Sequence, residues 1–141
     1  MAYDKVLPGT NTPTSADHAP SEWVVDTVSS WVNNTGDASK VKPGWPAYGY
    51  KYGKATRIGD TYDVYSSATV FFRDIPKGAV VENPDPSISS HASIEGSWTS
   101  IVSPADIVQT QETLKEKFPD LGGPMVWEAE GMNQELFDAL K

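Results

Sequence analysis

The sequence predicts an α+β fold in which an antiparallel sheet of about four strands is combined with an N-terminal helix and two C-terminal helices. Strand-like alternation of apolar residues is confined to the middle of the chain, and helical spacing of apolar residues occurs on both sides of it. A Gly-Asp pair joins two of the alternating segments and is typical of a hairpin turn. Strands gathered in one block, with helices outside it, favour α+β over a parallel α/β sheet.

Composition limits the classes of protein that the chain could represent. Its 141 residues are enough for one domain with a core, and five Trp, six Tyr and four Phe supply large side chains for that core. The sequence contains no cysteine, which excludes disulfides and thiolate metal sites. A net charge of −8 argues against nucleic acid as a partner. Residues 1–20 contain no apolar run, so we expect no signal peptide, no membrane contact, and a location in the cytoplasm or in a virion.

The N-terminal part divides into an arm and a helix. Prolines and a glycine punctuate residues 1–20 and predict an extended arm, either frayed or ordered against a neighbouring subunit, ahead of a single α+β domain at 21–141. The spacing predicts a helix over 21–34, with Ser21 as its cap and Gly36 as its stop. The expected apolar stripe of this helix comprises Val24, Val28, Trp31 and Val32.

The clearest local pattern is a predicted β-hairpin. Residues 47–58 and 61–73 alternate, and Gly59-Asp60 between them predicts a two-residue turn. This register pairs Tyr52 with Ser67 and places Tyr48, Tyr50 and Tyr52 together on one face. The opposite face carries glycines and aliphatic residues, so we expect that face to lie under a helix and the tyrosines to face away from the helices.

The remaining elements follow from turn and cap signals. Residues 79–82 and 92–102 predict two further strands, and the segment 35–46, which holds Trp45 between two prolines, predicts a loop. Residues 103–118 predict a helix capped by Ser103. A last helix is expected over residues 128–140, after a loop at 119–127.

A row of tyrosines on a half-exposed sheet has three interpretations, which the sequence leaves open. The tyrosines could pack across strands, contact another protein, or form a platform for a sugar or for single-stranded nucleic acid. The candidate interaction or ligand surface comprises Trp45, Tyr48, Tyr50, Tyr52, Lys54, Tyr65, Glu95 and Trp98. Residues 40–78 carry a charge of +4 within an otherwise acidic chain, and these cations could meet a second subunit or neutralise acidic residues of their own subunit.

The sequence offers few residues for catalysis. His18 falls in the expected arm, and His91 lies between serines at a strand edge, where sequence neighbours rarely form a catalytic triad. Glu95 is expected inside a strand and is a candidate binding or acid–base carboxylate. We predict no catalytic residues, no metal site and no cofactor, and whether the chain is an enzyme stays open, with the balance against it.

Three hypotheses for function follow. The leading one is a non-catalytic structural or interaction protein that forms homo-oligomers as a repeated subunit of an assembly, such as a virion component. The second is a small enzyme or ligand-binding protein with a tyrosine-lined pocket between sheet and helices. The third is a carbohydrate-binding module that uses Tyr48, Tyr50 and Tyr52.

Overall fold

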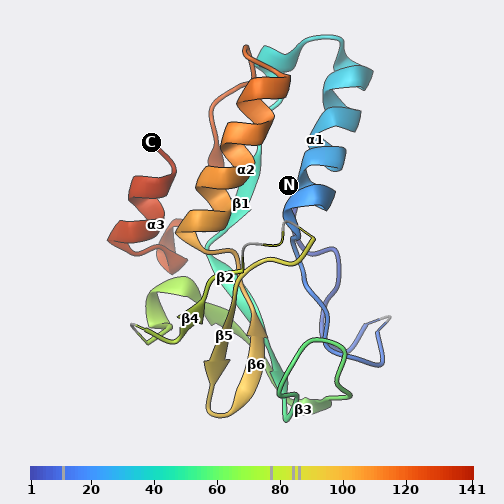
Figure 1. Cartoon of the computed structure of the whole chain (residues 1–141), viewed down its shortest axis with the longest axis vertical. Coiled ribbons are helices and arrows are strands. Elements are labelled where there is room, and N and C mark those ends of the chain that lie inside the picture. Colours follow the sequence, from blue (N-terminus) through green and yellow to red (C-terminus); the bar gives the residue numbers. More distant parts are fainter. Residues whose placement is uncertain (11, 77, 84, 86) are drawn as a thin grey trace.

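The computed structural model describes residues 1–10, 12–76, 78–83, 85 and 87–141. Within these residues it confirms the α+β fold (Figure 1). The α-helices are α1 (Ser21–Thr35), α2 (Pro104–Lys117) and α3 (Gln134–Ala139). Short 3₁₀ turns occur at Ala38–Lys40, Phe72–Asp74 and Ala129–Gly131. No helix in the described part of the chain combines the length and the apolar character needed to cross a membrane.

The strands form two separate sheets. The larger sheet is antiparallel with strand order β3-β2-β6-β5-β4. Its strands are β2 (Tyr48–Gly53), β3 (Asp63–Phe71), β4 (Val80–Val81), β5 (His91–Ile94) and β6 (Ser97–Ser100). The smaller sheet pairs β1 (Gly44–Pro46) with β7 (Met125–Trp127) in parallel. These two short strands lie in segments for which the sequence predicts loops, at 35–46 and 119–127.

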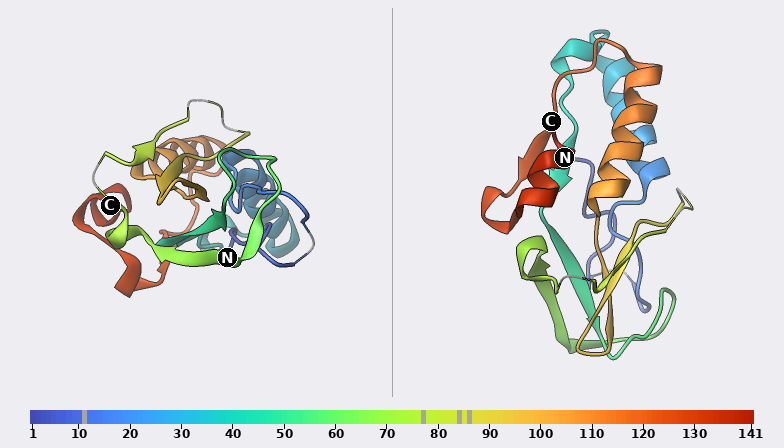
Figure 2. Two further views of the ribbon diagram at one scale, coloured as in Figure 1. Left: turned by 90° about the horizontal axis from the view of Figure 1, so that it is seen from below. Right: turned by 60° about the vertical axis from the view of Figure 1, so that its left-hand side comes forward.

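From the sequence we expected helices to cover one face of the large sheet. In the structure they do not cover it. In Figure 1 α1 and α2 lie side by side in the upper half of the molecule, beside β1, while the antiparallel strands extend below them (Figure 1). The right-hand view in Figure 2 shows the same separation of helices and large sheet. A buried hydrogen bond from Thr110 of α2 to Ser21 of α1, 2.7 Å between the hydroxyl oxygens, joins the two helices.

The predicted hairpin register is confirmed over the first part of β2. Tyr48 pairs with Phe71 and Lys51 with Ala68, which is the register that the predicted turn implies. The prediction of a two-residue turn at Gly59-Asp60 is wrong, because the register shifts beyond Lys51 and β2 ends at Gly53. The longer connection is organised by Asp60, whose carboxylate accepts hydrogen bonds from the Thr56 backbone and hydroxyl at 3.0 and 2.9 Å.

A second hairpin replaces the single strand predicted over residues 92–102. β5 and β6 pair antiparallel, and Glu95 and Gly96 connect them. Both residues have positive φ, 52° and 75°, which is the backbone geometry of the tight turns that join antiparallel strands. Glu95 therefore lies at a turn and not inside a strand.

The boundaries of α1 agree closely with those predicted from the sequence. The predicted N-cap and one residue of the predicted apolar stripe are wrong. Gly36 ends α1 at a φ of 67°, as predicted, whereas the N-cap is Pro20 and Ser21 is the first helical residue. The buried stripe contains Val24, Val28 and Val32, but Trp31 is 61% exposed.

The C-terminal helices show one confirmed cap and one shortened element. For α2 the predicted Ser103 cap is confirmed, and its hydroxyl and the Asp106 carboxylate form a reciprocal capping box. The predicted helix over 128–140 is shorter, because α3 begins after the Asn133 cap.

The assignment of the hairpin faces is wrong. Tyr48 and Tyr52 are buried and Tyr50 is half-buried, while Val64 on β3 is exposed. The cover over Tyr48 and Tyr50 comes from the N-terminal segment 1–20 and not from a helix, since the rings of Tyr3 and His18 pack on them. This segment has no helix or strand among its described residues, yet Ala2, Tyr3, Ser15, Asp17, His18 and Ala19 are all buried. The domain boundary at residue 20 stays a prediction.

Candidate functional site

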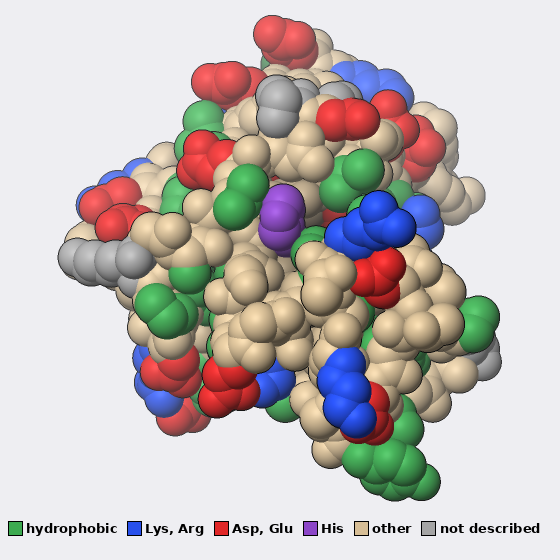
Figure 3. Space-filling model, turned by 60° about the horizontal axis from the view of Figure 1, so that its bottom comes forward, with side chains coloured by type: hydrophobic (Ala, Val, Ile, Leu, Met, Phe, Trp, Pro, Cys, Tyr) green, Lys and Arg blue, Asp and Glu red, His purple; other side chains and the backbone are tan. Residues whose placement is uncertain are grey.

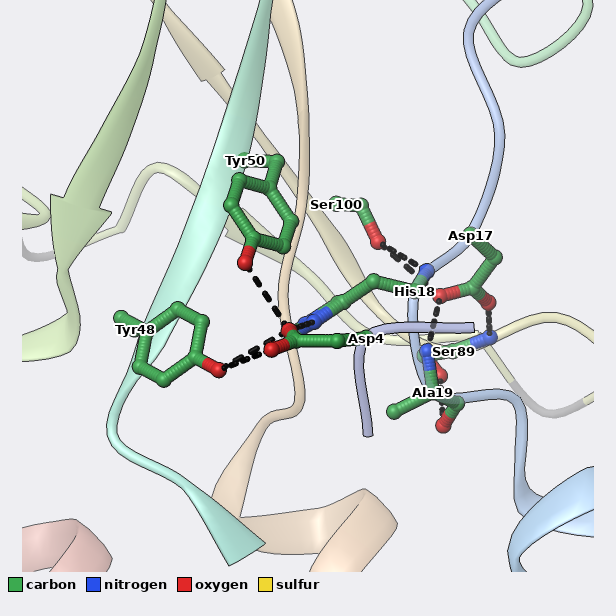
Figure 4. A network of polar contacts seen from close by, with 8 residues as sticks. All are labelled: Asp4, Asp17, His18, Ala19, Tyr48, Tyr50, Ser89 and Ser100. Carbon is green, nitrogen blue, oxygen red and sulfur yellow. Dashed lines mark hydrogen bonds and ion pairs between the residues drawn. The ribbon is translucent and has the colours of Figure 1, made fainter. Parts of the chain in front are cut away.

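The N-terminal segment and β2 together place a carboxylate against two tyrosines (Figure 4). The Tyr48 hydroxyl lies 2.8 and 2.9 Å from the two Asp4 carboxylate oxygens, and the Tyr50 hydroxyl donates to Oδ1 at 2.9 Å. His18 Nδ1 lies 3.6 Å from the same Asp4 oxygen. We call Asp4, His18, Tyr48 and Tyr50 the Asp4 cluster. Its members come from two distant segments of the chain and meet where the N-terminal segment crosses β2.

Local backbone geometry explains why these side chains converge. Tyr48 and Tyr50 are two residues apart on one strand, so their side chains share a face. Asp4 adopts a φ of 63°, a left-handed conformation that is uncommon outside glycine, although Asp tolerates it better than most residues. Such conformations are retained where surrounding structure enforces them, and they concentrate at functional sites. Next to Asp4, the Lys5 amide donates to the His18 carbonyl at 2.8 Å, which joins the two ends of the N-terminal segment.

A second network of hydrogen bonds holds His18 in position. Its amide donates to Ser100 Oγ at 3.1 Å, and the Ser100 hydroxyl donates to Asp17 Oδ1 at 2.9 Å. The other Asp17 oxygen accepts a hydrogen bond from the Ser89 amide, and the Ser89 hydroxyl donates to the Ala19 carbonyl at 2.8 Å. Figure 4 shows this network beside the Asp4 cluster. The carboxylate oxygens of Asp17 are thus occupied by hydrogen bonds within the protein. Asp4 remains partly exposed, with 34% of its side chain accessible to solvent.

Electrostatics keep Asp4 ionised and the tyrosines neutral. Partial burial would raise the pKa of Asp4, but its contacts with His18, Tyr48 and Tyr50 outweigh burial and lower that pKa below its ordinary value of 3.8. Burial and the neighbouring Asp4 carboxylate raise the pKa of both Tyr48 and Tyr50 well above 10.0. At neutral pH the cluster is therefore a carboxylate held by two hydroxyl donors. A carboxylate has about four lone-pair sites, so Asp4 can still accept hydrogen bonds from a ligand.

Five buried side-chain polar atoms have no hydrogen-bond partner among the described residues. They are the hydroxyls of Tyr3 and Tyr52, both ring nitrogens of His18 and the indole Nε1 of Trp45. Burial raises the pKa of Tyr52 to about 12. Most buried polar side chains in proteins form hydrogen bonds, so each of these atoms is an exception.

The structure does not bring the eight predicted site residues together on one surface. Trp45, Tyr52 and Trp98 are buried, and the rings of Tyr52 and Trp98 pack with centroids 5.6 Å apart. Tyr65 is 98% exposed on β3, and Lys54 and Glu95 are exposed at the same end of the sheet, beyond β2 and at the β5–β6 turn. Of the eight, only Tyr48 and Tyr50 belong to the Asp4 cluster.

Most of the described cations of residues 40–78 pair with acidic residues of the same chain. Lys51 contacts Glu95 at 2.7 Å, Lys54 contacts Asp63 at 2.8 Å, and Arg73 contacts Glu130 at 3.2 Å. On the face shown in Figure 3, basic side chains lie beside acidic ones. This pattern supports the interpretation that the basic segment neutralises acidic residues within one subunit.

Sequence reasoning missed Asp4 and gave His18 no role. Both lie in a segment rich in Pro, Thr and Ser that has no apolar periodicity, and neither has a motif around it that indicates packing. The available signal was the alternation of Tyr48 and Tyr50, since buried tyrosine hydroxyls usually have a polar partner. Among the described residues no group of three or more His, Asp or Glu side chains is placed to hold a metal ion.

Comparison with known proteins identifies the class of fold. No family model matches the sequence, and no curated protein matches it. Solved structures do match in fold. A chitinase-like agglutinin from Robinia pseudoacacia has a TM-score of 0.81 at 17% identity, over 99% of this chain and 44% of the agglutinin.

Two enzymes show the same similarity. The class V chitinase of Nicotiana tobaccum, as a mutant in complex with NAG4, has a TM-score of 0.78 at 16% identity, over 99% of this chain and 47% of the chitinase. Catalytic domain 2 of the Ostrinia furnacalis Group II chitinase, in complex with an N-acetylglucosamine oligomer, has a TM-score of 0.75 at 19% identity, over 99% and 45% of the two chains. This chain therefore has a chitinase-like fold and spans less than half the length of these structures.

These comparisons contradict the leading functional hypothesis. The fold is shared with carbohydrate-active and carbohydrate-binding proteins, and nothing in the comparisons indicates a virion component or a structural homo-oligomer. The tyrosines that suggested a protein contact are largely covered by the chain itself. The alternatives that involve a ligand or a carbohydrate agree better with the fold.

Proposed function

We propose that this chain binds a glycan built from N-acetylglucosamine units and that the Asp4 cluster contributes to the binding site. The observation that carries this proposal is the partly exposed, ionised Asp4 carboxylate, held by Tyr48 and Tyr50, on a fold shared with proteins in complex with such oligomers. Sugars present many hydroxyl donors, and a fixed carboxylate accepts hydrogen bonds from them without reorganising.

An exposed aromatic residue supports the same proposal. Trp127 ends β7 beside Pro46, and its backbone carbonyl accepts a hydrogen bond from the amide of Ala47, the residue before Tyr48. The Trp127 side chain is 54% exposed. Small-molecule sites combine an exposed apolar ring of this kind with a few polar groups such as a carboxylate.

The protonation state of Asp4 favours binding over hydrolysis as the role of this cluster. Glycoside hydrolysis generally requires a carboxylic acid whose raised pKa lets it donate a proton to the leaving oxygen. The pKa of Asp4 is lowered instead, so this group is an acceptor at neutral pH. Asp106 does have a pKa raised by burial, but its carboxylate accepts hydrogen bonds from the backbone amides of Ser90 and Ser103 at the start of α2.

Titration calorimetry with chitotetraose tests the proposal, with cellotetraose as the matched ligand that lacks acetamido groups. We expect binding of chitotetraose with a Kd between about 10 µM and 1 mM, and weaker binding of cellotetraose. Asp4→Asn keeps the side-chain shape and removes the charge, and we expect about a tenfold loss of affinity, or about 1.4 kcal/mol. Tyr65→Ser, at an exposed aromatic outside the cluster, is the control and should bind as the unaltered chain does. Failure of chitotetraose to bind, or equal affinity of Asp4→Asn, would show the proposal to be wrong.

A further inference from the structure

His18 is fully buried, and neither nitrogen of its ring has a hydrogen-bond partner among the described residues. Buried polar side chains in proteins are nearly always hydrogen-bonded, so an imidazole with two unpaired nitrogens requires an explanation. The ring lies against Tyr50 and Tyr48, at centroid distances of 5.2 and 5.9 Å. Figure 4 shows it pointing toward Asp4, whose Oδ1 lies 3.6 Å from Nδ1. The ring therefore directs one of its nitrogens at the carboxylate of the Asp4 cluster.

Backbone hydrogen bonds fix the position of His18 relative to Asp4. The His18 amide donates to Ser100 Oγ at 3.1 Å, and its carbonyl accepts a hydrogen bond from the Lys5 amide at 2.8 Å. Lys5 directly follows Asp4 in the chain, so this second bond holds the backbone beside the carboxylate. The other carboxylate nearby, that of Asp17, is occupied by Ser100 and by a backbone amide. The imidazole is thus held close to Asp4 in particular.

The two ring nitrogens of His18 have different surroundings, which decides where a proton is favoured. A neutral imidazole carries one proton, and its position depends on the groups that each nitrogen faces. Nδ1 faces the Asp4 carboxylate, which is ionised at neutral pH. A proton on Nδ1 directs a donor at this anion, whereas a proton on Nε2 would place the lone pair of Nδ1 against it. The distance of 3.6 Å exceeds that of a hydrogen bond, so the contact is an electrostatic attraction, which the protein interior screens only weakly.

We infer that His18 carries its proton on Nδ1 and is a positioning residue for the Asp4 carboxylate. Tyr48 and Tyr50 hold the carboxylate through two hydroxyl donors from β2, and His18 adds a third donor from the N-terminal segment. Three donors restrict Asp4 to one orientation before a ligand arrives, which lowers the entropic cost of binding. The effect on affinity rests on the proposed glycan function, whereas the tautomer and the ionisation of Asp4 are properties of the chain alone.

The tautomer can be read in the unaltered chain. The sequence contains only two histidines, His18 and His91, so the spectrum of His91→Gln assigns both rings. The measurement is two-bond proton–nitrogen correlation NMR on the chain labelled with ¹⁵N-histidine, at about pH 8, where an imidazole is ordinarily neutral. For His18 we expect a proton on Nδ1 and none on Nε2. A proton on Nε2 with none on Nδ1 would overturn the inference, and this result does not depend on any substitution of His18.

Two substitutions separate the donor from the ring. His18→Phe keeps an aromatic ring against the two tyrosines and removes both nitrogens, whereas His18→Asn removes the ring and places an amide N–H near the position of Nδ1. Burial raises the pKa of Asp4, and its contact with His18 is among those that lower it. In carbon NMR titrations we therefore expect a higher pKa for Asp4 in His18→Phe than in His18→Asn. Chitotetraose should bind His18→Phe about threefold to tenfold more weakly than His18→Asn.

A role for His18 in packing alone predicts the opposite order of affinities, because phenylalanine preserves the contacts of the ring better than asparagine does. An equal pKa of Asp4 in the two variants, or tighter binding by His18→Phe, would overturn the inference. If the tautomer and the pKa difference are as expected but the unaltered chain binds no chitotetraose, the positioning role stands and only the glycan proposal is contradicted. Circular dichroism checks the folding of both variants, and if either fails to fold, the tautomer in the unaltered chain decides.

Discussion

Tyr48→Phe is the substitution that tests most directly whether the Asp4 cluster is held as the structure shows. It removes one hydroxyl and leaves the aromatic ring, which packs against Tyr3, His18 and Tyr50. The lost hydrogen bond joins a buried hydroxyl to an ionised carboxylate at 2.8 Å. Hydrogen bonds to charged groups contribute about 1.5–3 kcal/mol.

The expected loss lies at the lower end of that range. Asp4 keeps its hydrogen bond from Tyr50, and 34% of its side chain is accessible to water, which can replace the missing hydroxyl in part. We therefore expect the free energy of unfolding to fall by about 1.5 kcal/mol, or the melting temperature by about 3–6 °C. Urea unfolding followed by tryptophan fluorescence at pH 7 measures the first quantity, and calorimetry measures the second.

The pH dependence of this loss provides a sharper measurement. Because the folded-state pKa of Asp4 is below 3.8, its ionised form stabilises the fold above that pH, and this contribution disappears as pH falls through the folded-state pKa. The difference between Tyr48→Phe and the unaltered chain should therefore be constant from about pH 5 to 7 and shrink as the pH falls below about 4. Tyr65→Phe, at an exposed position, is the matched control and should show no difference. A loss under about 0.5 kcal/mol at pH 7, or one that does not change with pH, would refute the reasoning.

Four further substitutions test the fold. Leu114→Ala removes a fully buried side chain of α2 and should cost about 3–4 kcal/mol by chemical unfolding, and a cost under about 1 kcal/mol would contradict its place in the core. Gly49→Ala should destabilise the fold far more than Gly36→Ala, because a methyl group on Gly49 would lie only 2.6 Å from the Ile101 side chain. A methyl group on Gly36 has free space around it, so the cost there is the strain of a φ of 67°, about 1–2 kcal/mol. Ser103→Ala breaks the capping box of α2 and should cost about 1–2 kcal/mol, and an unchanged melting curve would show that the cap contributes nothing.

The sequence predicted the elements whose signals are local. The boundaries of α1 and α2 follow from Gly36 and from Ser103, because a cap acts within one turn of its helix. The hairpin register was correct to the residue over Tyr48–Lys51, even though the turn expected at Gly59-Asp60 is a longer loop. Alternation constrains a strand over its whole length, so a correct register does not require a correct turn.

The sequence did not predict the elements that depend on distant partners. β1 and β7 have three residues each, and they pair across about 80 residues of intervening chain. Pro46 at the end of β1 argued against a strand, although a proline is tolerated at a position that needs no backbone donor. We expected Glu95 inside a strand because strand-like residues continue on both sides of Glu95-Gly96, which the structure shows to be two strands, β5 and β6.

The error over the tyrosine face has a single physical cause, and it also explains why the candidate site was missed. Alternation along a strand predicts that one face is buried, but it does not identify the segment that covers this face. We expected a helix to cover it because helices carry recognisable apolar stripes. The cover is instead an irregular segment whose packing depends on specific polar contacts: Asp4 to Tyr48, and His18 to Ser100. Such contacts leave no periodic signal.

The same contacts make the Asp4 cluster dependent on the completed sheet. Its hydrogen bonds join residues 44 and 46 positions apart, and the bond that fixes the His18 backbone spans 82 positions. The full set of these bonds requires β2 and β6 to lie next to each other, because Tyr50 and Ser100 are paired in that ladder. The carboxylate is therefore held by two hydroxyls of β2, and the N-terminal segment that carries it is itself fixed to β6 through the His18 backbone. A site built in this way loses little conformational entropy when it accepts a ligand, which is the physical reason to look for glycan binding at Asp4 before any more exposed surface of the chain.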